Sequence, residues 1–302
     1  MSQTFLAIDG MAYIFRAYHA VPYMCSHAGV PTNALYGFQK IYNALVSSLE
    51  PDYLAVAFDT HEPTFRHKAY PQYKAQRPPA PEELLEQIPL VKEFLKAMNV
   101  KVVETPGYEA DDALATMALD AKKHGLKAVI ATSDKDLCQL VDDDIFILRA
   151  AMNTRDFEML DRGGVFRHYG VYPEQIIDYL TIVGDAADNV KGVAGLGEKS
   201  AREILATQRT LQGALDNLSS LKPAWQKKLL EAKDEIAMTR FLIKICTEVP
   251  LDFTLEETAM KDPNAELLGD FCRRLDITTF GARLNTAPKK ENPKPTIQQE
   301  LF

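Results

Sequence analysis

Residues 4–10 read TFLAIDG, a short apolar run that ends at an aspartate. A run of this length is typical of a strand that is buried on both faces of a sheet. The pattern recurs in YLAVAF at 53–58, which is also followed by an aspartate. Further strand patterns lie at 100–105, 127–132 and 145–148, so we expect five strands in the first half of the chain.

Helical patterns separate these strands at 33–49, 82–98 and 110–124. The last of them closes with KKHG at 122–125, where a basic last turn and a glycine mark the C-terminus of a helix. Strands that alternate with helices indicate a parallel sheet with helices on both faces. The sequence therefore predicts an α/β fold with a mainly parallel sheet flanked by helices.

The second half of the chain is helical in pattern. Helices are expected at 173–183, 198–206, 211–217, 223–246 and 264–275, with spacing too irregular for a repeat protein. Residues 288–302, PKKENPKPTIQQELF, are rich in proline and lysine, and we expect them to form a disordered tail.

The composition is that of a globular protein. The chain has 302 residues, of which 46% are apolar and 25% are charged, and this length suits about two domains. No apolar run approaches the roughly 18–20 residues of a membrane helix, and the N-terminus resembles no signal peptide. None of the four cysteines forms a CxxC pair, so we expect no structural zinc and reduced thiols in the cytoplasm.

Nine acidic residues occupy positions that a parallel sheet would bring together. Asp9 and Asp59 follow two strands and Asp134 lies just beyond a third. The carboxyl ends of parallel strands line the ligand site of such a sheet. The other six are Glu109, Asp111 and Asp112 at a helix start, Asp136 in a D-x-D pair with Asp134, and Asp185 and Asp188 in the segment GDAADN.

Such a cluster predicts a metal site. Carboxylates gathered without counter-charge repel one another and take up protons, which a hard divalent cation prevents. Oxygen ligands without histidine or cysteine favour Mg²⁺ or Mn²⁺ over zinc. The acids exceed what one ion needs, so we expect two ions, an arrangement that hydrolyses phosphodiesters. Setting the nine aside leaves 33 acids against 34 bases, so the net charge of −8 reflects this cluster.

Simpler interpretations exist for each motif alone. Acids in a first helical turn interact favourably with the helix dipole and need no metal. An isolated GDAADN segment is more often a turn than a site. The agreement of three strand ends favours the metal-site hypothesis.

Five segments together resemble a known family. They are AIDG at 7–10, AFD at 57–59, YEADD at 108–112, TSDKD at 132–136 and GDAADN at 184–189. In this order they resemble the structure-specific 5′ nucleases, above all the 5′-nuclease domain of bacterial DNA polymerase I and its free-standing relatives. The resemblance covers roughly residues 1–285 and leaves open whether the chain is free-standing or part of a polymerase.

The resemblance implies a fold and an activity. A PIN-like nuclease core is expected over 1–172, with a helical arch near 64–90, and a helical DNA-binding region over 173–287. The implied activity is that of a metal-dependent 5′→3′ exonuclease and flap endonuclease acting on DNA flaps, nicks and junctions. Its roles would lie in replication and repair, including Okazaki primer removal, as a monomer near the bacterial nucleoid.

The resemblance also implies two sets of metal ligands. The first metal would be held by Asp9, Asp59, Glu109, Asp111 and Asp112, and the second by Asp134, Asp136, Asp185 and Asp188. Some free-standing relatives lack part of the second set, whereas this chain has all of it. An active enzyme is therefore expected.

Residues 64–77, TFRHKAYPQYKAQR, carry cations interleaved with aromatic rings and no acid. This composition is typical of a single-strand channel, although a solvated basic loop would share it. We expect Arg66, Lys68 and Tyr73 to contact DNA. The resemblance places the arch here and implies that Lys74 and Arg77 are catalytic cations that stabilise charge at the cleaved phosphate.

Phe15, Arg16 and His19 follow the first strand on an expected helix. A core position would explain Phe15 equally well. The resemblance implies that Phe15 stacks on a base beside the cleavage site and that Arg16 and His19 contact phosphates.

The segment GVAGLGEKSA at 192–201 is a glycine hairpin that enters a helix. Backbone N–H groups at such a point can bind phosphates without reading bases, although close helix packing would also require glycine. The segment resembles the family's helix–three-turn–helix, here near 184–206, which grips duplex DNA and often holds K⁺. Its implied DNA contacts are Gly195, Gly197 and Lys199.

Two other function classes compete with the nuclease. A phosphatase of the haloacid-dehalogenase type also has an aspartate after its first strand, but it needs a D-x-D there and this chain has Asp9-Gly10-Met11. A catalytically idle DNA-binding protein would gain nothing from crowded carboxylates, which destabilise a fold.

Residues 298–302, QQELF, resemble the short peptide that binds the bacterial sliding clamp. Gln298 would offer an amide to a polar subsite, and Leu301 and Phe302 would fill an apolar pocket. Two such anchors support binding of only micromolar strength once the peptide is ordered. A chance match, or a linker to a further domain, is the alternative.

Overall fold

The computed structural model describes residues 3–150 and 157–277. These residues form two compact units. The first is built from residues up to 12, 52–80 and 101–259, and the second from 13–51, 81–100 and the described residues after 259. The first unit holds the whole sheet and all nine acids of the expected metal site.

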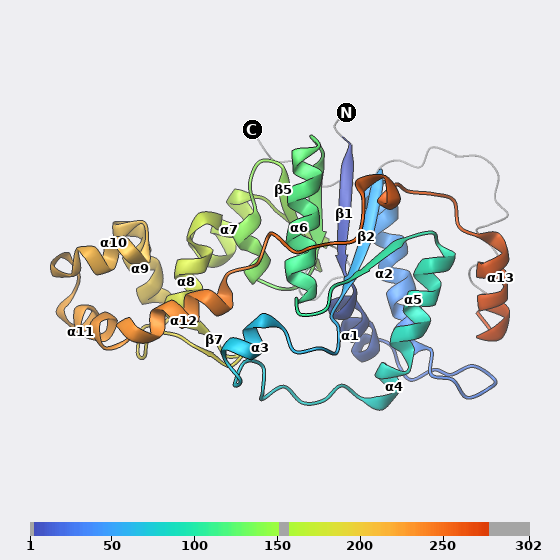
Figure 1. Cartoon of the computed structure of the whole chain (residues 1–302), viewed down its shortest axis with the longest axis horizontal. Helices are drawn as coiled ribbons and strands as arrows, with labels where there is room; N and C mark the ends of the chain where they lie inside the picture. Colours follow the sequence, from blue (N-terminus) through green and yellow to red (C-terminus); the bar gives the residue numbers. More distant parts are fainter. Residues whose placement is uncertain (1–2, 151–156, 278–302) are drawn as a thin grey trace. The chain divides into compact units, whose positions relative to one another are not determined.

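A six-stranded sheet forms the centre of the first unit (Figure 1). Its strands run in the order β3-β2-β1-β4-β5-β6, and neighbouring strands are parallel except for β5 and β6. The strands are β1 (Thr4–Asp9), β2 (Tyr53–Phe58), β3 (Lys101–Glu104), β4 (Lys127–Ala131), β5 (Ile145–Ala150) and β6 (Phe157–Leu160). The expected α/β fold class and its five strands are confirmed, and β6 is an addition that the sequence did not indicate.

The strand order reverses at β1. Successive strands are added on one side of β1 up to β3 and on its other side from β4 onward. Ligands of open α/β sheets bind at such a point, beyond the carboxyl ends of the strands. Asp9 ends β1 and the loop after β4 carries Asp134, so the topology places these two aspartates at neighbouring strand ends.

Helix α6 (Ala110–Lys123) fixes a second group of acids at the same edge of the sheet. It packs against β1 and β4 through small buried side chains such as Ala113 and Ala118, and Figure 1 shows it running beside β1. The helix connects the end of β3 to the start of β4. The N-terminus of α6 therefore lies at the carboxyl edge of the parallel strands, and the acidic turn that starts at Glu109 lies there with it.

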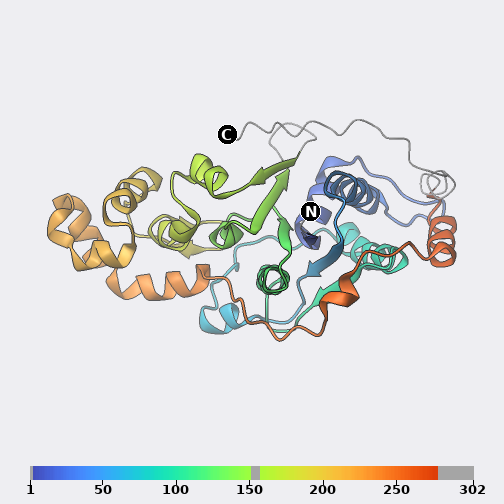
Figure 2. The same ribbon diagram turned by 90° about the horizontal axis from the view of Figure 1, so that it is seen from above.

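The other helices of the first unit are α3 (Phe65–Ala69), α7 (Arg162–Tyr169), α8 (Ile176–Val183), α9 (Glu198–Gln208), α10 (Leu211–Asp216), α11 (Pro223–Glu231) and α12 (Lys233–Ile243). Of these, α3 lies between β2 and β3 in the sequence and the rest follow β6. Helices α8 and α12 pack against each other, and Figure 2 shows this helical part from above. Helix α7 was not expected from the sequence.

Between α8 and α9 the chain forms a tight hairpin of β7 (Gly184–Asp185) and β8 (Val190–Lys191). Gly184 has a φ of +82°, and a Cβ on Gly192 would overlap the nitrogen of Gly184. The two backbones are therefore in direct contact, which only glycine permits. This contact positions the loop that carries Asp185 and Asp188.

Two helices that we expected to be continuous are broken. The helix expected at 223–246 is split at Ala232, because α12 packs against α8 while α11 packs against the 3₁₀ turn that precedes it. The helix expected at 82–98 is split after Leu85, because Pro89 has no N–H to donate to the carbonyl of Leu85.

The second unit is helical. It contains most of α1 (Gly10–Ala20), with α2 (Asn33–Leu49), α4 (Glu82–Leu85), α5 (Gln87–Ala97) and α13 (Ala265–Arg274). Helix α5 packs against α2 and α13. The Gln87 side chain accepts a hydrogen bond from the N–H of Ala34 at 2.7 Å and donates one to Asn33 at 3.0 Å. Gln87 thus satisfies the N-terminus of α2.

In the described ranges, no helix has both the length and the apolar character needed to span a membrane. The domain boundary expected at residue 172 and the assignment of 64–90 to an arch stay predictions. The expected disordered tail, 288–302, lies outside the described residues.

Candidate active site

Asp9 is buried between two neighbouring strand ends. It accepts hydrogen bonds from the N–H of Ala12 and from the Thr132 hydroxyl, each at 2.9 Å. Burial raises its pKa to about 6, and the charges of Asp59 and Asp134 add to this rise against the two hydrogen bonds. The fold therefore leaves part of the negative charge of Asp9 uncompensated.

Asp111, Asp134 and Asp136 also have raised pKa values. Burial raises the pKa of each, and the charge of Asp134 raises the pKa of the other two further. Oδ1 of Asp136 is buried without a hydrogen-bond partner, and Nζ of Lys135 lies 3.8 Å from it. A buried carboxylate oxygen without a partner needs an explanation, and an ion that binds there is one.

Replacing Asp9 by asparagine is expected to stabilise the protein when divalent metal is absent. Its folded-state pKa of about 6 exceeds the ordinary 3.8, so its contribution to the free energy of unfolding falls as pH rises between these values. At pH 7 the ionised group costs about 3 kcal/mol, and Asp9→Asn removes this cost. Thermal unfolding in EDTA from pH 4 to pH 7 measures the effect. A variant that is less stable than the parent at pH 7 contradicts it.

Glu109, Asp185 and Asp188 differ from these acids because cations pair with them. Lys135 Nζ lies 2.5 Å from Asp185, and Lys74 Nζ forms an ion pair with Glu109 and lies 3.7 Å from Asp188. Arg77 also pairs with Asp188. Burial alone would raise the pKa of Asp188, but the charges of Lys74 and Arg77 lower it below its usual value.

Asp112 is fully buried and saturated with hydrogen bonds. Its two oxygens accept from both terminal nitrogens of Arg66 at 2.8 Å, from the N–H of Glu109 at 3.1 Å and from the N–H of Cys246 at 2.8 Å. Four donors use the lone pairs that a carboxylate offers. The expectation that Asp112 holds a metal does not fit this arrangement.

Arg66 and Tyr73, expected as DNA contacts, lie inside the protein. Arg66 is 1% exposed and Tyr73 is 4% exposed. The Tyr73 hydroxyl lies 3.0 Å from carboxylate oxygens of both Glu109 and Asp188. The expectation is wrong for these two residues, because a basic and aromatic composition does not separate side chains that face DNA from those that compensate buried acids.

The segment that carries Lys74 and Arg77 is docked on the loop between β7 and β8. The Lys74 N–H donates to the Asp188 carbonyl at 2.9 Å, and the Asn189 amide donates to the Gln72 carbonyl at 2.8 Å. Arg77 Nε lies 3.3 Å from the Ala187 carbonyl. The segment with the expected catalytic cations is thus attached to the loop that carries Asp188 by hydrogen bonds to backbone carbonyls.

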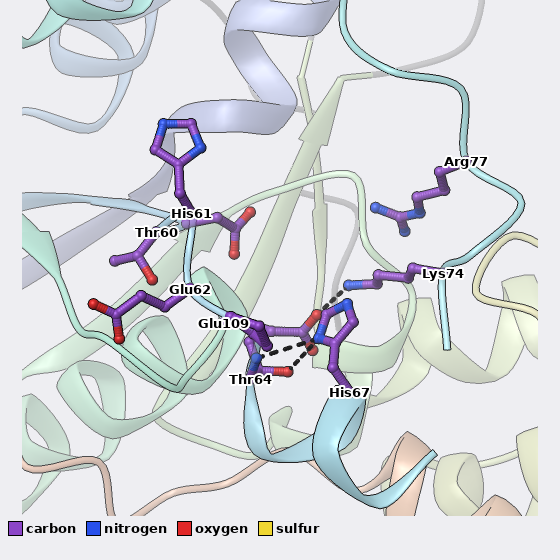
Figure 3. Close-up of a pocket in the computed structure, with 10 residues that line it drawn as sticks. Thr60, His61, Glu62, Thr64, His67, Lys74, Arg77 and Glu109 are labelled. Atoms are coloured by element: carbon purple, nitrogen blue, oxygen red, sulfur yellow. Dashed lines mark hydrogen bonds and ion pairs between the residues drawn. The ribbon is translucent and has the colours of Figure 1, made fainter. Parts of the chain in front are cut away.

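Lys74 and Arg77 also line a pocket of about 350 Å³ (Figure 3). Its other walls are Asp59, Thr60, His61, Glu62, Pro63, Thr64, His67 and Glu109. Figure 3 shows Lys74 reaching across the pocket to Glu109. Asp59 accepts a hydrogen bond from the N–H of Ala110 at 2.8 Å, which joins the end of β2 to the start of α6. The pocket therefore combines carboxylates with the long cationic side chains of Lys74 and Arg77. Binding of a phosphate beside a metal ion would require both.

The acids do not form a finished metal site. Within residues 3–150 and 157–277, no three His, Cys, Asp or Glu side chains meet in an arrangement that could hold a metal ion. Lys74, Lys135 and Arg77 hold three of the acids in ion pairs. The structure brings the nine acids into one unit and does not assemble them into one cluster.

The other expected DNA contacts lie on three separate elements. Arg16 and His19 are exposed on α1 and Phe15 is half-buried there, while Lys68 is exposed on α3. Gly195, Gly197 and Lys199 occupy the loop and first turn of α9. Their roles in DNA binding stay predictions.

Two residues near these sites were missed from the sequence. Lys135 stands inside the TSDKD segment, so its position between two acids could have indicated an internal counter-charge. Lys228 donates to the Gly195 carbonyl at 2.6 Å, where Gly195 has a φ of +75°. No local pattern marks Lys228, because it comes from a helix 33 residues further along the chain.

Two adjoining family models match the chain. Residues 4–170 match the 5′-3′ exonuclease, N-terminal resolvase-like domain. Residues 171–266 match the 5′-3′ exonuclease, C-terminal SAM fold. Together they span nearly all the residues that the structure describes.

Known proteins with similar sequences include a free-standing nuclease and a polymerase. A 5′-3′ exonuclease of Aquifex aeolicus is 34% identical over 278 residues, which are 92% of this chain and 94% of that protein. The thermostable DNA polymerase I of Thermus aquaticus is 37% identical over 291 residues, which are 96% of this chain. The chain spans about a third of that polymerase, 33% of its length.

A solved structure shares the fold. The bacteriophage T5 D15 flap endonuclease, in a pseudo-enzyme–product complex with DNA and metal ions, matches with a TM-score of 0.67. The match covers 93% of this chain and 100% of that one at 20% sequence identity. At this identity the likeness concerns the arrangement of the elements alone.

Proposed function

The chain belongs to the 5′-3′ exonuclease family, and on this basis we propose that it cuts DNA at 5′ flaps, nicks and single-strand/duplex junctions. The reaction is metal-dependent hydrolysis of phosphodiester bonds, with 5′→3′ exonuclease and flap endonuclease modes. The observation that carries this proposal is the strand edge at which Asp9 lies buried, and Asp111 and Asp134 half-buried, all with raised pKa values. Replication and repair in the cytoplasm are the setting that we propose.

Two divalent ions, Mg²⁺ or Mn²⁺, fit the donor chemistry of this edge. The donors are oxygens only, and the Asp136 oxygen without a partner supports a cation there. We assign the ions to Asp9, Asp59, Glu109, Asp111, Asp134, Asp136, Asp185 and Asp188. When bound, such ions supply Lewis-acid stabilisation of charge on the phosphate and a more acidic water. The side chains of Lys74, Lys135 and Arg77 compensate part of the acidic charge before that.

The cations of the pocket are proposed to act on the cleaved phosphate. Lys74→Ala and Arg77→Ala should each lower the single-turnover cleavage rate more than they weaken DNA binding. These cations would contact charge that develops in the transition state, so their loss affects the rate rather than the grip. Single-turnover kinetics and equilibrium binding on one 5′-flap duplex measure the two effects. Variants that change affinity alone contradict the assignment.

The loop that precedes α9 is proposed to grip the duplex. Lys199 is exposed in the first turn of this helix. The first backbone N–H groups of a helix have no partner within it and can bind a phosphate. Lys199→Ala should weaken binding of a flap duplex and reduce the slope of log affinity against log salt by about one. Binding isotherms at several KCl concentrations measure this slope. An unchanged slope with a reduced cleavage rate would place Lys199 at the reaction centre instead.

One assay separates the proposed function from its alternatives. The full chain is incubated with a labelled 5′-flap duplex and Mg²⁺, with the same duplex and EDTA, and with p-nitrophenyl phosphate. Cleavage of the flap in Mg²⁺ alone supports the nuclease. Binding of the duplex without cleavage would indicate a catalytically idle DNA-binding protein, and hydrolysis of p-nitrophenyl phosphate would indicate a phosphatase.

Two further partners are proposed from the sequence. The segment QQELF at 298–302 would bind the bacterial sliding clamp through Gln298, Leu301 and Phe302, which lie outside the described residues. Titration of a labelled 288–302 peptide with the clamp, beside a peptide carrying Leu301→Ala and Phe302→Ala, tests this. Equal binding of the two peptides contradicts it. K⁺ at the helix–three-turn–helix is the second proposal.

A further inference from the structure

Arg66 is the most deeply buried large side chain of the candidate site. It is 1% exposed, and each of its five N–H groups has a partner. The terminal nitrogens donate to Glu109 at 2.8 Å, to both Asp112 oxygens at 2.8 Å and to the Lys244 carbonyl at 2.8 Å. Nε donates to the Leu242 carbonyl at 2.9 Å. A guanidinium is the side chain whose donors suit such a planar set.

Arg66 and its partners belong to three segments that are far apart in the sequence. Arg66 lies on α3, Glu109 and Asp112 open α6, and the two carbonyls belong to the C-terminal end of α12. The last carbonyls of a helix have no partner within the helix, so Arg66 satisfies groups that would otherwise be buried without one. The Cys246 N–H adds a second link from this segment to Asp112, at 2.8 Å.

Helix α12 extends this connection to the glycine hairpin. It packs along α8, and the Thr239 hydroxyl donates to the Lys191 carbonyl of β8 at 2.9 Å. The same hairpin carries Asp185, which the family resemblance assigns to the second metal. The C-terminal half of α12 therefore contacts both the hairpin, through Thr239, and the acidic turn of α6, through Arg66.

Arg66 is held in its charged form at this position. Burial acts to lower its pKa, but the hydrogen bonds and charges of Asp112 and Glu109 raise it above its ordinary value. Asp112 is saturated by four donors and cannot turn toward an ion without leaving Arg66 unpaired. Glu109 differs, because it has three donors instead of four: Arg66 and Tyr73 donate to Oε2, and Lys74 alone pairs with Oε1.

We propose that Arg66 is a positioning residue that, anchored on Asp112, holds the Glu109 carboxylate in place for a divalent ion and joins it to the end of α12. Asp112 is then the anchor of this junction and binds no metal. The inference rests on the proposed function for its metal site. Partners that orient a ligand in this way are worth about 10–100-fold in metal affinity.

Calorimetric titration of MnCl₂ into the DNA-free full chain tests the proposal. Arg66→Met is expected to raise the Kd for Mn²⁺ by about 10–100-fold at a temperature where circular dichroism shows the variant folded. Were Asp112 a ligand, removing Arg66 would free it and tighten binding. Affinity equal to or tighter than that of the parent therefore overturns the proposal.

A control variant separates an effect on the orientation of Glu109 from an effect on the stability of the fold. Arg240 on α12 also pairs with a buried carboxylate, that of Asp178, and has no contact with the candidate metal acids in the described structure. Arg240→Met should lower the melting temperature and leave the Mn²⁺ affinity unchanged. A weaker Mn²⁺ affinity in this variant as well would show that general destabilisation explains both, and would overturn the proposal.

A double variant keeps the test informative if Arg66→Met unfolds. Arg66→Met combined with Asp112→Leu replaces a buried ion pair by apolar side chains, which often restores stability. We expect the double variant to recover its melting temperature and still to bind Mn²⁺ weakly, because Oε2 of Glu109 has then lost its hydrogen bond from Arg66. Recovery of both properties overturns the positioning role.

Failure of the inference and failure of the proposed function give different results. A parent protein that cuts flap DNA while Arg66→Met binds Mn²⁺ normally refutes the inference alone. A parent that binds Mn²⁺ with the expected loss in Arg66→Met, yet cuts no flap, refutes the proposed function alone. A parent that binds no Mn²⁺ refutes both.

Discussion

Replacement of Asp134 by asparagine should abolish DNA cleavage and leave binding of a flap duplex within a few-fold of the parent. Asp134 lies half-buried beyond the end of β4, and its charge raises the pKa values of Asp9, Asp111 and Asp136. An amide of the same shape cannot supply the charge that a divalent ion requires. Because the loss concerns a direct metal ligand, we expect a rate reduction of more than about 100-fold.

Asp185→Asn should behave in the same way, since it removes a carboxylate of the second set. The residues that are proposed to hold the duplex, Gly197 and Lys199, lie further along the chain at the start of α9, so affinity should survive in both variants. Single-turnover cleavage in Mg²⁺ and filter binding in EDTA are the two measurements. Near-normal cleavage by either variant would refute the assignment. Loss of binding along with cleavage would indicate that the acids support the fold instead.

Replacement of Gly192 by alanine should have the largest effect on stability. The new Cβ would overlap backbone atoms of Gly184 and Val183 and would lie 2.5 Å from the Ile182 carbonyl oxygen. Backbone atoms at the end of a packed helix cannot move aside as a flexible side chain can. We expect a loss of about 3 kcal/mol or more in the free energy of unfolding. This corresponds to a fall in melting temperature on the order of 10 °C.

Gly197→Ala is the matched control, since it makes the same change five residues further along the chain. A Cβ on Gly197 would meet no atom within 4 Å, and its φ of −100° suits any residue. Its melting temperature should therefore match that of the parent. Differential scanning calorimetry compares the two variants. Equal melting temperatures for Gly192→Ala and the parent would show that the hairpin can open, and would refute the contact as a requirement.

Local sequence patterns predicted the sheet well, because buried strands and the helices between them are marked by residue type alone. The failures have local physical causes. Pro89 interrupts a helix that its neighbours favour, and Ala232 marks no break in the sequence because the change of direction there depends on what α11 and α12 pack against. Such partners come from distant parts of the chain, so no window of sequence contains them.

For the candidate site, the sequence predicted where the acids lie but did not predict the roles of all the residues around them. Strand ends and the first turn of α6 placed Asp9, Asp59, Asp111 and Asp134 correctly at one edge of the sheet, since the topology of a parallel sheet follows from the order of its elements. The roles of Arg66 and Tyr73 were not predictable in this way. Both stand in a segment whose composition suits a DNA channel, and only the fold shows that they are turned inward.

By itself, the sequence determined the α/β class, the placing of aspartates after the strand ends and the oxygen-only chemistry of the site. These properties depend on residue type and on order along the chain. The tertiary structure alone decided which acids keep an uncompensated charge. Asp9 and Asp136 lie buried with raised pKa values, whereas Asp112 is neutralised by Arg66 and Asp188 by Lys74 and Arg77. The physical reason is that the energy of a buried charge depends on the distance to its counter-charge, and that distance is set by contacts between segments more than 40 residues apart.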